Sequence, residues 1–369
     1  MCLALVLALM LLCFASCGII KGDTVMEYEG YKITEAMYSY WASSFKGILL
    51  SDLMSGGQYS SASEAVIWNT PLDDGSTYGS FWKEYLDSYA KQVLICQKLF
   101  DDYGLRLSEE AKSRVESSIE QLEVGFGGVA GLNEYLAKYN LNIKTLKNIY
   151  YAEEKMQTVV DYVFGSDGPL AVSYTEQSAY YNEKYYCVNW IYIYTEMKPD
   201  TENEGTGGDD VINMVPLSES EKAEKMQLVE DILAKLRSGE ETFAYMKSKY
   251  CEDKNADGSS PYDYYPSGFN LSANSVSDYG VGIIKTIQGM EIGSFATYTD
   301  EYATRIIVRN PLKELNSLTA QEKSFMVDFD SYVLSAKSDN YFGSIEVTVY
   351  ADVMARYDVT KINAISSAV

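Results

Sequence analysis

The chain has 369 residues, of which 47% are hydrophobic and 22% are charged, so it can bury a sizeable core and is not a disordered protein. Its formal net charge of −23 would repel nucleic-acid phosphates and argues against a nucleic-acid-binding role. Cationic or neutral partners fit this charge better. The chain contains no histidine and its six cysteines show no CxxC spacing, so the sequence predicts no zinc or haem site and no cofactor.

The N-terminus begins with a short apolar run, residues 3–14, which is too short to serve as a permanent membrane-spanning helix. It ends in the stretch ASCG, and small residues immediately before a cysteine resemble the lipobox of bacterial lipoproteins. We therefore expect residues 1–17 to be a lipoprotein signal peptide with Cys17 as the lipidated residue, which would anchor the mature protein to the outer side of the bacterial cell membrane. Two features depart from this pattern: Phe14 stands where leucine is usual, and no basic segment precedes the run. An ordinary signal peptide that ends near a cysteine is the alternative.

The first half of the mature chain has mainly helical periodicity. Residues 25–34, VMEYEGYKIT, predict a short strand or hairpin that leads into a helix over residues 34–50. Apolar residues at helical spacing, with a capping serine at 108 and helix-ending glycines at 104 and 165, predict further helices. These helices are expected over residues 81–104, 108–122 and 143–165.

The pattern changes after Gly168-Pro169, where a helix is followed by a strand, YCVNWIYIYT, over residues 186–195. An acidic loop comes next, and then Ser218 and Glu221 form a capping box that opens another helix. A shorter helix and a glycine- and proline-punctuated loop lead to a second strand, ATRIIVR. The sequence thus predicts an α+β fold in which a helical lobe carries an inserted α+β domain. We expect the lobe over residues 18–170, the insertion over residues 171–311, and a helical C-terminal segment packing on the lobe over residues 312–369.

The order of these elements resembles the PrsA/SurA-type foldases, which are secreted or lipid-anchored proteins with a helical chaperone lobe and an inserted parvulin-type prolyl isomerase domain. The first strand of parvulins looks like V-K-H-I-L-V, and residues 188–193 follow that pattern with Trp190 in place of histidine. A segment similar to F-x-x-L-A-x-x-Y-S-x-D ends at Asp253, which matches a polar active-site position. The parvulin pattern G-Y-H-I-I is met by residues 303–307, so Arg305 replaces the second histidine.

The resemblance implies a peptide groove that contains Trp190, Tyr192 and Arg305. Indole has one hydrogen-bond donor and no acceptor, and a guanidinium is permanently charged, so this pair cannot reproduce the two imidazoles. We therefore expect a parvulin-like domain with reduced or absent isomerase activity. An active isomerase that uses Asp253, Cys251 and tyrosine hydroxyls is one alternative. In another, Trp190 is simply a core residue.

Three further features bear on ligands. Asp253, Asn255 and Asp257 have the spacing of a calcium-binding loop, but Tyr264 stands where the bidentate glutamate belongs, so an Asx-rich turn without metal is expected. The acidic loop over residues 200–210 would attract basic segments, unless it is only a solvated loop. The three cysteines of the mature chain beyond Cys17 are expected to be buried small side chains, with at most one disulfide between them.

The functional expectation is a lipid-anchored, extracytoplasmic foldase or chaperone. Its partners would be unfolded or newly exported proteins, including basic or proline-containing segments. The 33 tyrosines can supply half-exposed apolar surface for such clients or can simply fill helix faces. A surface lipoprotein that captures glycans or nutrients on tyrosine platforms is the alternative from a different functional class.

Overall fold

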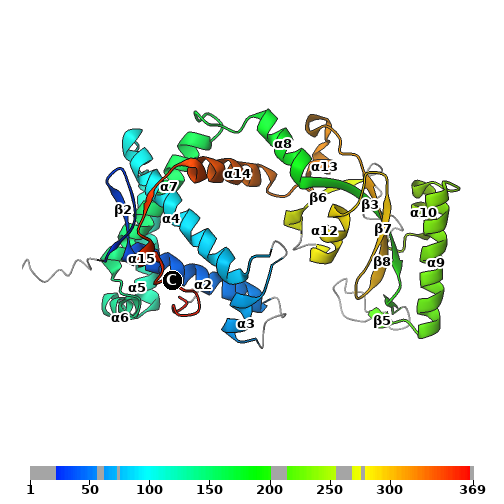
Figure 1. The fold of residues 1–369 in the computed structure, drawn as a ribbon, viewed down its shortest axis with the longest axis horizontal. Helices are drawn as coiled ribbons and strands as arrows, with labels where there is room; N and C mark the ends of the chain where they lie inside the picture. The colour runs from blue at the N-terminus through cyan, green and yellow to red at the C-terminus, as the bar shows by residue number, and fades with distance from the viewer. Residues whose placement is uncertain are drawn as a thin grey trace, which may run out of the picture. The chain divides into compact units, whose positions relative to one another are not determined.

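The computed structural model describes residues 22–55, 62–72, 75–200, 214–254, 268–275 and 279–365. Helices and small antiparallel sheets make up the fold, which confirms the predicted α+β class (Figure 1). The chain divides into two compact units: residues 1–172 join 334–369 in the first, and residues 173–333 form the second. The predicted signal peptide and Cys17 lie outside the described residues. In the described part of the chain, no helix has both the length and the apolar character needed to cross a bilayer.

The first unit is built mainly from helices. They are α2 (Glu35–Ser55), α3 (Glu64–Asn69), α4 (Tyr78–Asp102), α5 (Glu109–Gly125), α6 (Val129–Ala137), α7 (Ile143–Phe164), the part of α14 (Phe329–Ser344) from Leu334 onward, and α15 (Ala351–Met354). A small sheet joins the two ends of the unit, because β1 (Thr24–Tyr28) pairs with both β2 (Tyr31–Thr34) and β9 (Thr348–Val349). The hairpin expected over residues 25–34 is therefore confirmed.

Helix boundaries in this unit follow the capping residues predicted from the sequence. The Ser108 side chain accepts a hydrogen bond from the amide of Ala111 at the start of α5. Gly104 follows the end of α4 with a φ of +61°, a left-handed conformation that glycine adopts without steric cost. The C-terminal segment packs against α2, where the Lys46 ammonium donates to the carbonyl of Ile362 at 2.8 Å. Local signals thus set the helices, and long-range contacts bring the tail back to them.

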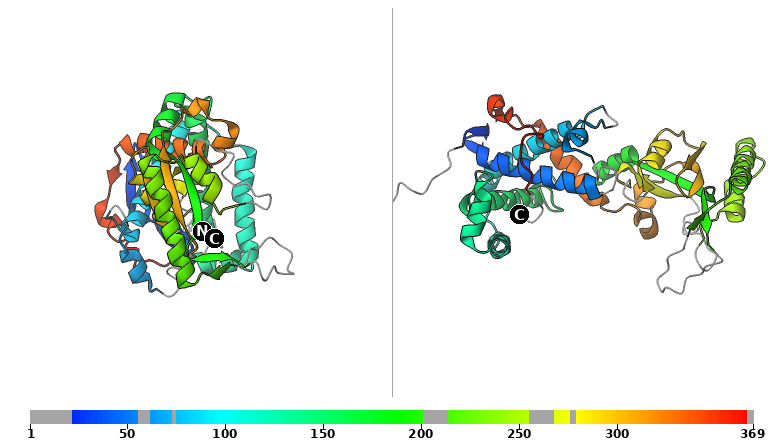
Figure 2. Two further views of the ribbon diagram at one scale, coloured as in Figure 1. Left: turned by 90° about the vertical axis from the view of Figure 1, so that its right-hand side faces the viewer. Right: turned by 90° about the horizontal axis from the view of Figure 1, so that it is seen from below.

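The second unit contains a four-stranded antiparallel sheet of order β6-β3-β8-β7. The strands are β3 (Tyr185–Tyr194), β6 (Phe269–Ser272), β7 (Phe295–Thr299) and β8 (Ala303–Asn310). One face of the sheet packs on α12 (Val281–Gln288), and the other packs on α9 (Glu219–Ser238) and α10 (Phe243–Tyr250), as Figures 1 and 2 show. The remaining elements are α8 (Tyr174–Lys184), α13 (Ala320–Lys323), the two short 3₁₀ turns Ala273–Ser275 and Leu315–Ser317, and the two-stranded ribbon of β4 (Met197–Pro199) and β5 (Met214–Pro216).

Two details differ from the sequence-based expectation. The segment expected to be a loop after the shorter helix contains β6 and α12, so that expectation was wrong, and a further strand, β7, directly precedes the second strand. The second compact unit continues to Val333, past the expected boundary at residue 311. Its extension is held by a cluster in which Leu315, Leu318 and Met326 pack with two buried tyrosines of α8 and β3. The assignment of these units as chaperone and parvulin domains stays a prediction.

Candidate functional site

The pairing of β3 with β8 brings together three residues of the predicted peptide groove. Tyr192 lies directly opposite Arg305, and Trp190 lies opposite Ile307 in the same register. Since side chains alternate between the two faces of a strand, Trp190, Tyr192 and Arg305 all project to one face of the sheet. Arg305 is more than one hundred residues away from Trp190 and Tyr192 in the sequence, and the sheet brings the three side chains into one cluster.

Trp190 is part of the hydrophobic core of the second unit. Its side chain is only 1% exposed and belongs to the cluster that includes Ile283 and Ile287 of α12. The ring of Phe269 packs edge-on against it at a centroid distance of 4.6 Å, and the ring of Tyr279 lies at 5.6 Å. This environment matches the alternative in which Trp190 is a core residue. Its role in a peptide groove stays a prediction.

Arg305 is held by aromatic rings and a carboxylate. Its guanidinium carbon lies 4.9 Å from the ring centroid of Tyr192 and 5.6 Å from that of Trp190, within cation–π range. Its Nη1 forms an ion pair with Asp300, whose other oxygen accepts the amide of Ala303 at 2.9 Å. Burial raises the pKa of Asp300, but the hydrogen bonds and the Arg305 charge outweigh burial and hold the pKa below its usual value. Arg305 is therefore a fixed cation with no proton acceptor to offer.

The predicted catalytic candidates follow α10 and lie along β3. The amide of Glu252 donates to the carbonyl of Tyr192 at 2.8 Å, and the amide of Tyr192 lies 3.5 Å from the sulfur of Cys251. Cys251 is buried, with a 4% exposed side chain. Burial raises the pKa of the Asp253 carboxyl, while the nearby Arg305 charge acts in the opposite direction. The charge of Asp253 acts on the Tyr192 hydroxyl, and the charge of Arg305 acts on the Asp253 carboxyl, so the three residues are neighbours. A catalytic role for Asp253 and Cys251 stays a prediction.

This cluster can supply hydrogen bonds but not imidazole chemistry. An isomerase needs groups that stabilise the twisted peptide bond more than the planar one, and no nucleophile is strictly required. Burial raises the pKa of the Tyr192 hydroxyl, so this group stays protonated and acts as a donor at neutral pH. The guanidinium of Arg305 is already engaged by Asp300. The chemical capacity that remains is one carboxyl group and tyrosine hydroxyls.

The calcium candidate and the acidic loop fall largely outside the residues that the structure describes. Asn255 and Asp257 lie outside the described residues, as do residues 201–213 of the loop. Within the described part of the chain, no group of three or more acidic or cysteine side chains is arranged to hold a metal ion. Cys96 and Cys187 are buried like Cys251, in agreement with the expectation of small buried side chains.

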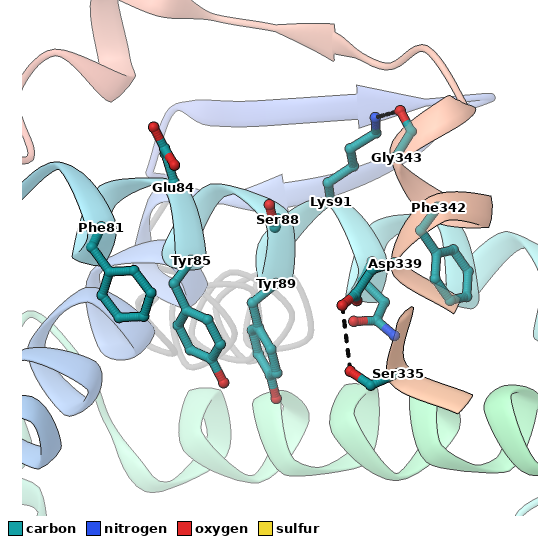
Figure 3. A pocket seen from close by; sticks show the side chains of 11 residues that line it. Phe81, Glu84, Tyr85, Ser88, Tyr89, Lys91, Ser335, Asp339, Phe342 and Gly343 are labelled. Carbon is teal, nitrogen blue, oxygen red and sulfur yellow. Dashed lines mark hydrogen bonds between the residues drawn. The ribbon is translucent and has the colours of Figure 1, made fainter. Parts of the chain in front are cut away.

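The sequence reasoning missed a second place of interest, a cavity of about 700 Å³ in the first unit. Phe81, Tyr85 and Tyr89 project into it from the same side of α4, and Ser335 and Asp339 enter it from α14 (Figure 3). We call Phe81, Tyr85 and Tyr89 the aromatic row. Its spacing of four residues is visible in the sequence and could have indicated one helix face. The position of Asp339 across the cavity could not have been found in this way.

The aromatic row is partly anchored and partly exposed. Phe81 is 48% exposed and Tyr85 is 52% exposed, whereas the hydroxyl of Tyr89 donates to the partly buried carboxylate of Glu153 at 3.2 Å. Phe45 of α2 packs edge-on against the rings of both tyrosines, with centroid distances of 4.9 and 5.0 Å. The cavity therefore has an ordered aromatic wall with two large side chains open to solvent.

No protein-family model matches this chain, and no curated protein matches it. Among solved structures, it is similar to the crystal structure of PrsA from Bacillus subtilis, with 14% identity, a TM-score of 0.22, and coverage of 80% of this chain and 90% of that chain. The chain resembles PrsA foldases over most of its length.

Two further structures show the same level of similarity. The foldase protein PrsA from Streptococcus pneumoniae str. Canada MDR_19A has 10% identity and a TM-score of 0.24, with coverage of 94% of this chain and 97% of that chain. The peptidylprolyl isomerase PrsA from Bacillus cereus has 15% identity and a TM-score of 0.26, with coverage of 79% and 98%. The similarity is thus extensive in length and low in identity and TM-score.

Proposed function

We propose that this protein is an extracytoplasmic foldase or chaperone that binds unfolded segments of exported proteins through its helical unit. The observation that carries the proposal is the aromatic row, because Phe81 and Tyr85 remain about half exposed at the edge of a cavity of about 700 Å³. Exposed apolar side chains grouped at a cavity are typical of surfaces that bind peptides or proteins. The cavity is open, so an extended segment can reach it without unfolding of the unit.

We propose further that the inserted unit has lost most or all prolyl isomerase activity. Two observations support this part. Trp190 stands where the resemblance places the first histidine, and its side chain is only 1% exposed. Arg305 stands at the second histidine position and is engaged by Asp300 and Tyr192. An active isomerase is the second candidate function, favoured by the raised pKa of Asp253 beside Tyr192 and Arg305.

The proposal includes attachment to the membrane through lipid on Cys17. The ASCG stretch supports it, since it places small residues directly before that cysteine. A Cys17→Ala variant expressed in a bacterium should leave the membrane fraction and become soluble. Retention of the variant in the membrane fraction would contradict lipid anchoring at this residue.

The direct test is suppression of client aggregation by the mature chain, starting after residue 17. A chemically unfolded protein is diluted into buffer with and without the mature chain, and aggregation is followed by light scattering. We expect the mature chain to slow aggregation and a Phe81→Ala variant to do so less well. Tyr162→Ala is the matched control, because Tyr162 is 47% exposed on α7 and does not line the cavity.

The outcomes separate the functional classes. Wild-type protein without any effect on aggregation would refute the chaperone proposal. Saturable binding of a sugar, together with no effect on unfolded protein, would support the surface lipoprotein that captures glycans. Equal activity of Phe81→Ala and Tyr162→Ala would remove the aromatic row from the account and leave the client site elsewhere.

A further inference from the structure

We propose that the cavity between α4 and α14 selects extended client segments in which a lysine or arginine neighbours an aromatic or other apolar side chain. This inference rests on the proposed function and names the class of client that the cavity takes. Three features carry it. The cavity has a packed aromatic wall, and Asp339 enters it from α14 opposite that wall. Among the described residues that line the cavity, Lys91 is the one cation, and it already donates a hydrogen bond to a backbone carbonyl.

Two of the three rings in the aromatic row, those of Tyr85 and Tyr89, are packed against other side chains of the unit. The rings of Tyr85 and Tyr89 are stacked at a centroid distance of 6.5 Å, and Phe45 packs edge-on against both from α2. The hydroxyl of Tyr89 is fixed by Glu153. Because these rings are already held in place, a ligand that packs on them loses little additional side-chain entropy from the protein. Aromatic faces also attract the cationic groups of lysine and arginine.

Two carboxylates line the cavity without a cationic partner. Asp339 of α14 accepts one hydrogen bond, from the Ser335 hydroxyl at 3.3 Å. Glu84 of α4 also lines the cavity, but its side chain projects from the opposite side of the helix to the aromatic row (Figure 3). Within the described residues, neither Asp339 nor Glu84 takes part in an ion pair. Both are exposed and can therefore receive a cation from outside the chain.

Asp339 and Tyr85 line the same cavity, one from α14 and the other from α4. Burial raises the pKa of the Tyr85 hydroxyl, and the negative charge of Asp339 raises it further. Lys91, the cation at this cavity, donates to the carbonyl of Gly343 at 2.8 Å and so is directed to the backbone of α14 (Figure 3). A client cation placed between Asp339 and Tyr85 would meet a carboxylate on one side and a phenol ring on the other.

The charge of the whole chain favours the same class of client. A net charge of −23 draws basic segments toward the protein and repels acidic ones. Phe81, at the exposed end of the row, offers apolar contact area to the residue beside the client cation. A neutral apolar segment would gain only the aromatic contacts, and an acidic segment would also meet like charge.

The test uses two fluorescein-labelled peptides that differ only in charge. One has a phenylalanine flanked by lysines in a glycine–serine background, and the other has glutamates in place of the lysines. Binding to the mature protein is measured by fluorescence anisotropy at low and at physiological salt. We expect the lysine peptide to bind at least about tenfold more tightly than the glutamate peptide, with affinity that falls as salt rises.

Variants assign this preference to the cavity. Asp339→Asn should weaken binding of the lysine peptide about three- to tenfold, the range expected for one exposed charge contact together with a cation–π contact. Phe81→Ala should weaken binding of any peptide that inserts an aromatic side chain. Glu120→Gln removes an equal charge from an exposed position on α5 and should leave binding unchanged. Thermal unfolding of each variant verifies that the unit is folded.

The inference and the proposed function fail in distinguishable ways. If Asp339→Asn and Glu120→Gln bind the lysine peptide as tightly as the wild type, the inference is overturned, even where the wild type suppresses aggregation. If the wild type has no effect on aggregation, the proposed function fails. Asp339-dependent binding of the lysine peptide would then still identify the cavity as a site for cationic, aromatic ligands.

Discussion

The guanidinium carbon of Arg305 lies 4.9 Å from the ring centroid of Tyr192, its direct partner across β3 and β8. The same guanidinium carbon lies 5.6 Å from the ring of Trp190, and Asp300 completes its surroundings with an ion pair. The side chain is only 18% exposed. At the position where the resemblance places a catalytic histidine, this chain therefore carries a cation that helps to hold the sheet together.

Removing this cation should destabilise the second unit. Arg305→Ala loses the contacts with both rings and leaves Asp300 without its charged partner, so we expect the free energy of unfolding to fall by about 1–3 kcal/mol. Urea denaturation measures the change. Asp300→Asn, which keeps the acceptor oxygen for the amides of Tyr302 and Ala303, should cost less. An Arg305→Ala variant as stable as the wild type would show that the cluster is not structural.

The cluster should not accelerate prolyl isomerisation. Cis/trans exchange of an X-Pro peptide, followed by NMR with the mature protein present, is expected to stay at the uncatalysed rate, because neither Trp190 nor Arg305 can act as an imidazole. Asp253→Asn should behave in the same way. Exchange well above the uncatalysed rate that disappears in Asp253→Asn would identify a histidine-free isomerase and would overturn this part of the proposal.

Glu153 should make the stability of the first unit depend on pH. Burial raises the pKa of its carboxyl above the ordinary value of 4.5, and hydrogen bonds from Trp41 at 2.7 Å and Tyr89 at 3.2 Å only partly offset the effect. A raised pKa means that the folded state binds the proton more tightly than the unfolded state. The Glu153 contribution to the free energy of unfolding is therefore fully present below pH 4.5 and is lost as pH rises through the folded pKa.

Two substitutions at this position separate charge from hydrogen bonding. Glu153→Gln keeps an acceptor for the Trp41 indole and removes the titration, so the loss of stability between pH 4.5 and neutrality should be smaller than in the wild type. Glu153→Ala leaves the indole without that acceptor and should cost about 1–3 kcal/mol. Urea denaturation at a series of pH values tests both. Identical pH profiles for the wild type and Glu153→Gln would contradict the assignment.

The docking of the C-terminal segment on α2 depends on a glycine. A Cβ at Gly47 would lie 2.0 Å from the carbonyl oxygen of Ile365, whose amide donates to the carbonyl of Ser43 at 3.0 Å. Gly47→Ala should therefore displace this segment and lower the free energy of unfolding by about 1–3 kcal/mol. Gly125→Ala is the control, because no atom lies within 4 Å of the new Cβ. Equal thermal stability of the two variants would argue against tight packing at Gly47.

Much of the fold could be predicted because it depends on local chemistry. Ser218 and Glu221 form the capping box that their spacing predicted, and Gly104 follows α4 where a left-handed residue is needed. The segment containing α12 was missed because its N-cap is Gly280, which offers no side-chain hydrogen bond. Its apolar residues gain stability by packing on Trp190, a contact that no local pattern encodes.

In the candidate sites, too, local features could be predicted from the sequence and long-range contacts could not. The resemblance implied a groove with Trp190, Tyr192 and Arg305, and the register of β3 with β8 puts these three residues on one face of the sheet. Their use as a groove stays a prediction. The ion pair of Arg305 with Asp300 was not foreseen, since it depends on the turn between β7 and β8. The cavity in the first unit forms only when Asp339 of α14 packs near α4, and these two segments are separated by more than half of the sequence. Only its aromatic row, a repeat of four residues on one helix, was present as a local signal.

The most direct test of the account is to ask which surface of the helical unit contacts a client. A photo-crosslinking phenylalanine analogue is placed at Phe81, in the cavity, or at Tyr162, which is equally exposed on α7. The mature protein is then illuminated with a chemically unfolded client. The account predicts crosslinked client from position 81 and little from position 162. Equal crosslinking at both positions, or crosslinking from position 162 alone, would contradict binding of clients at the aromatic row.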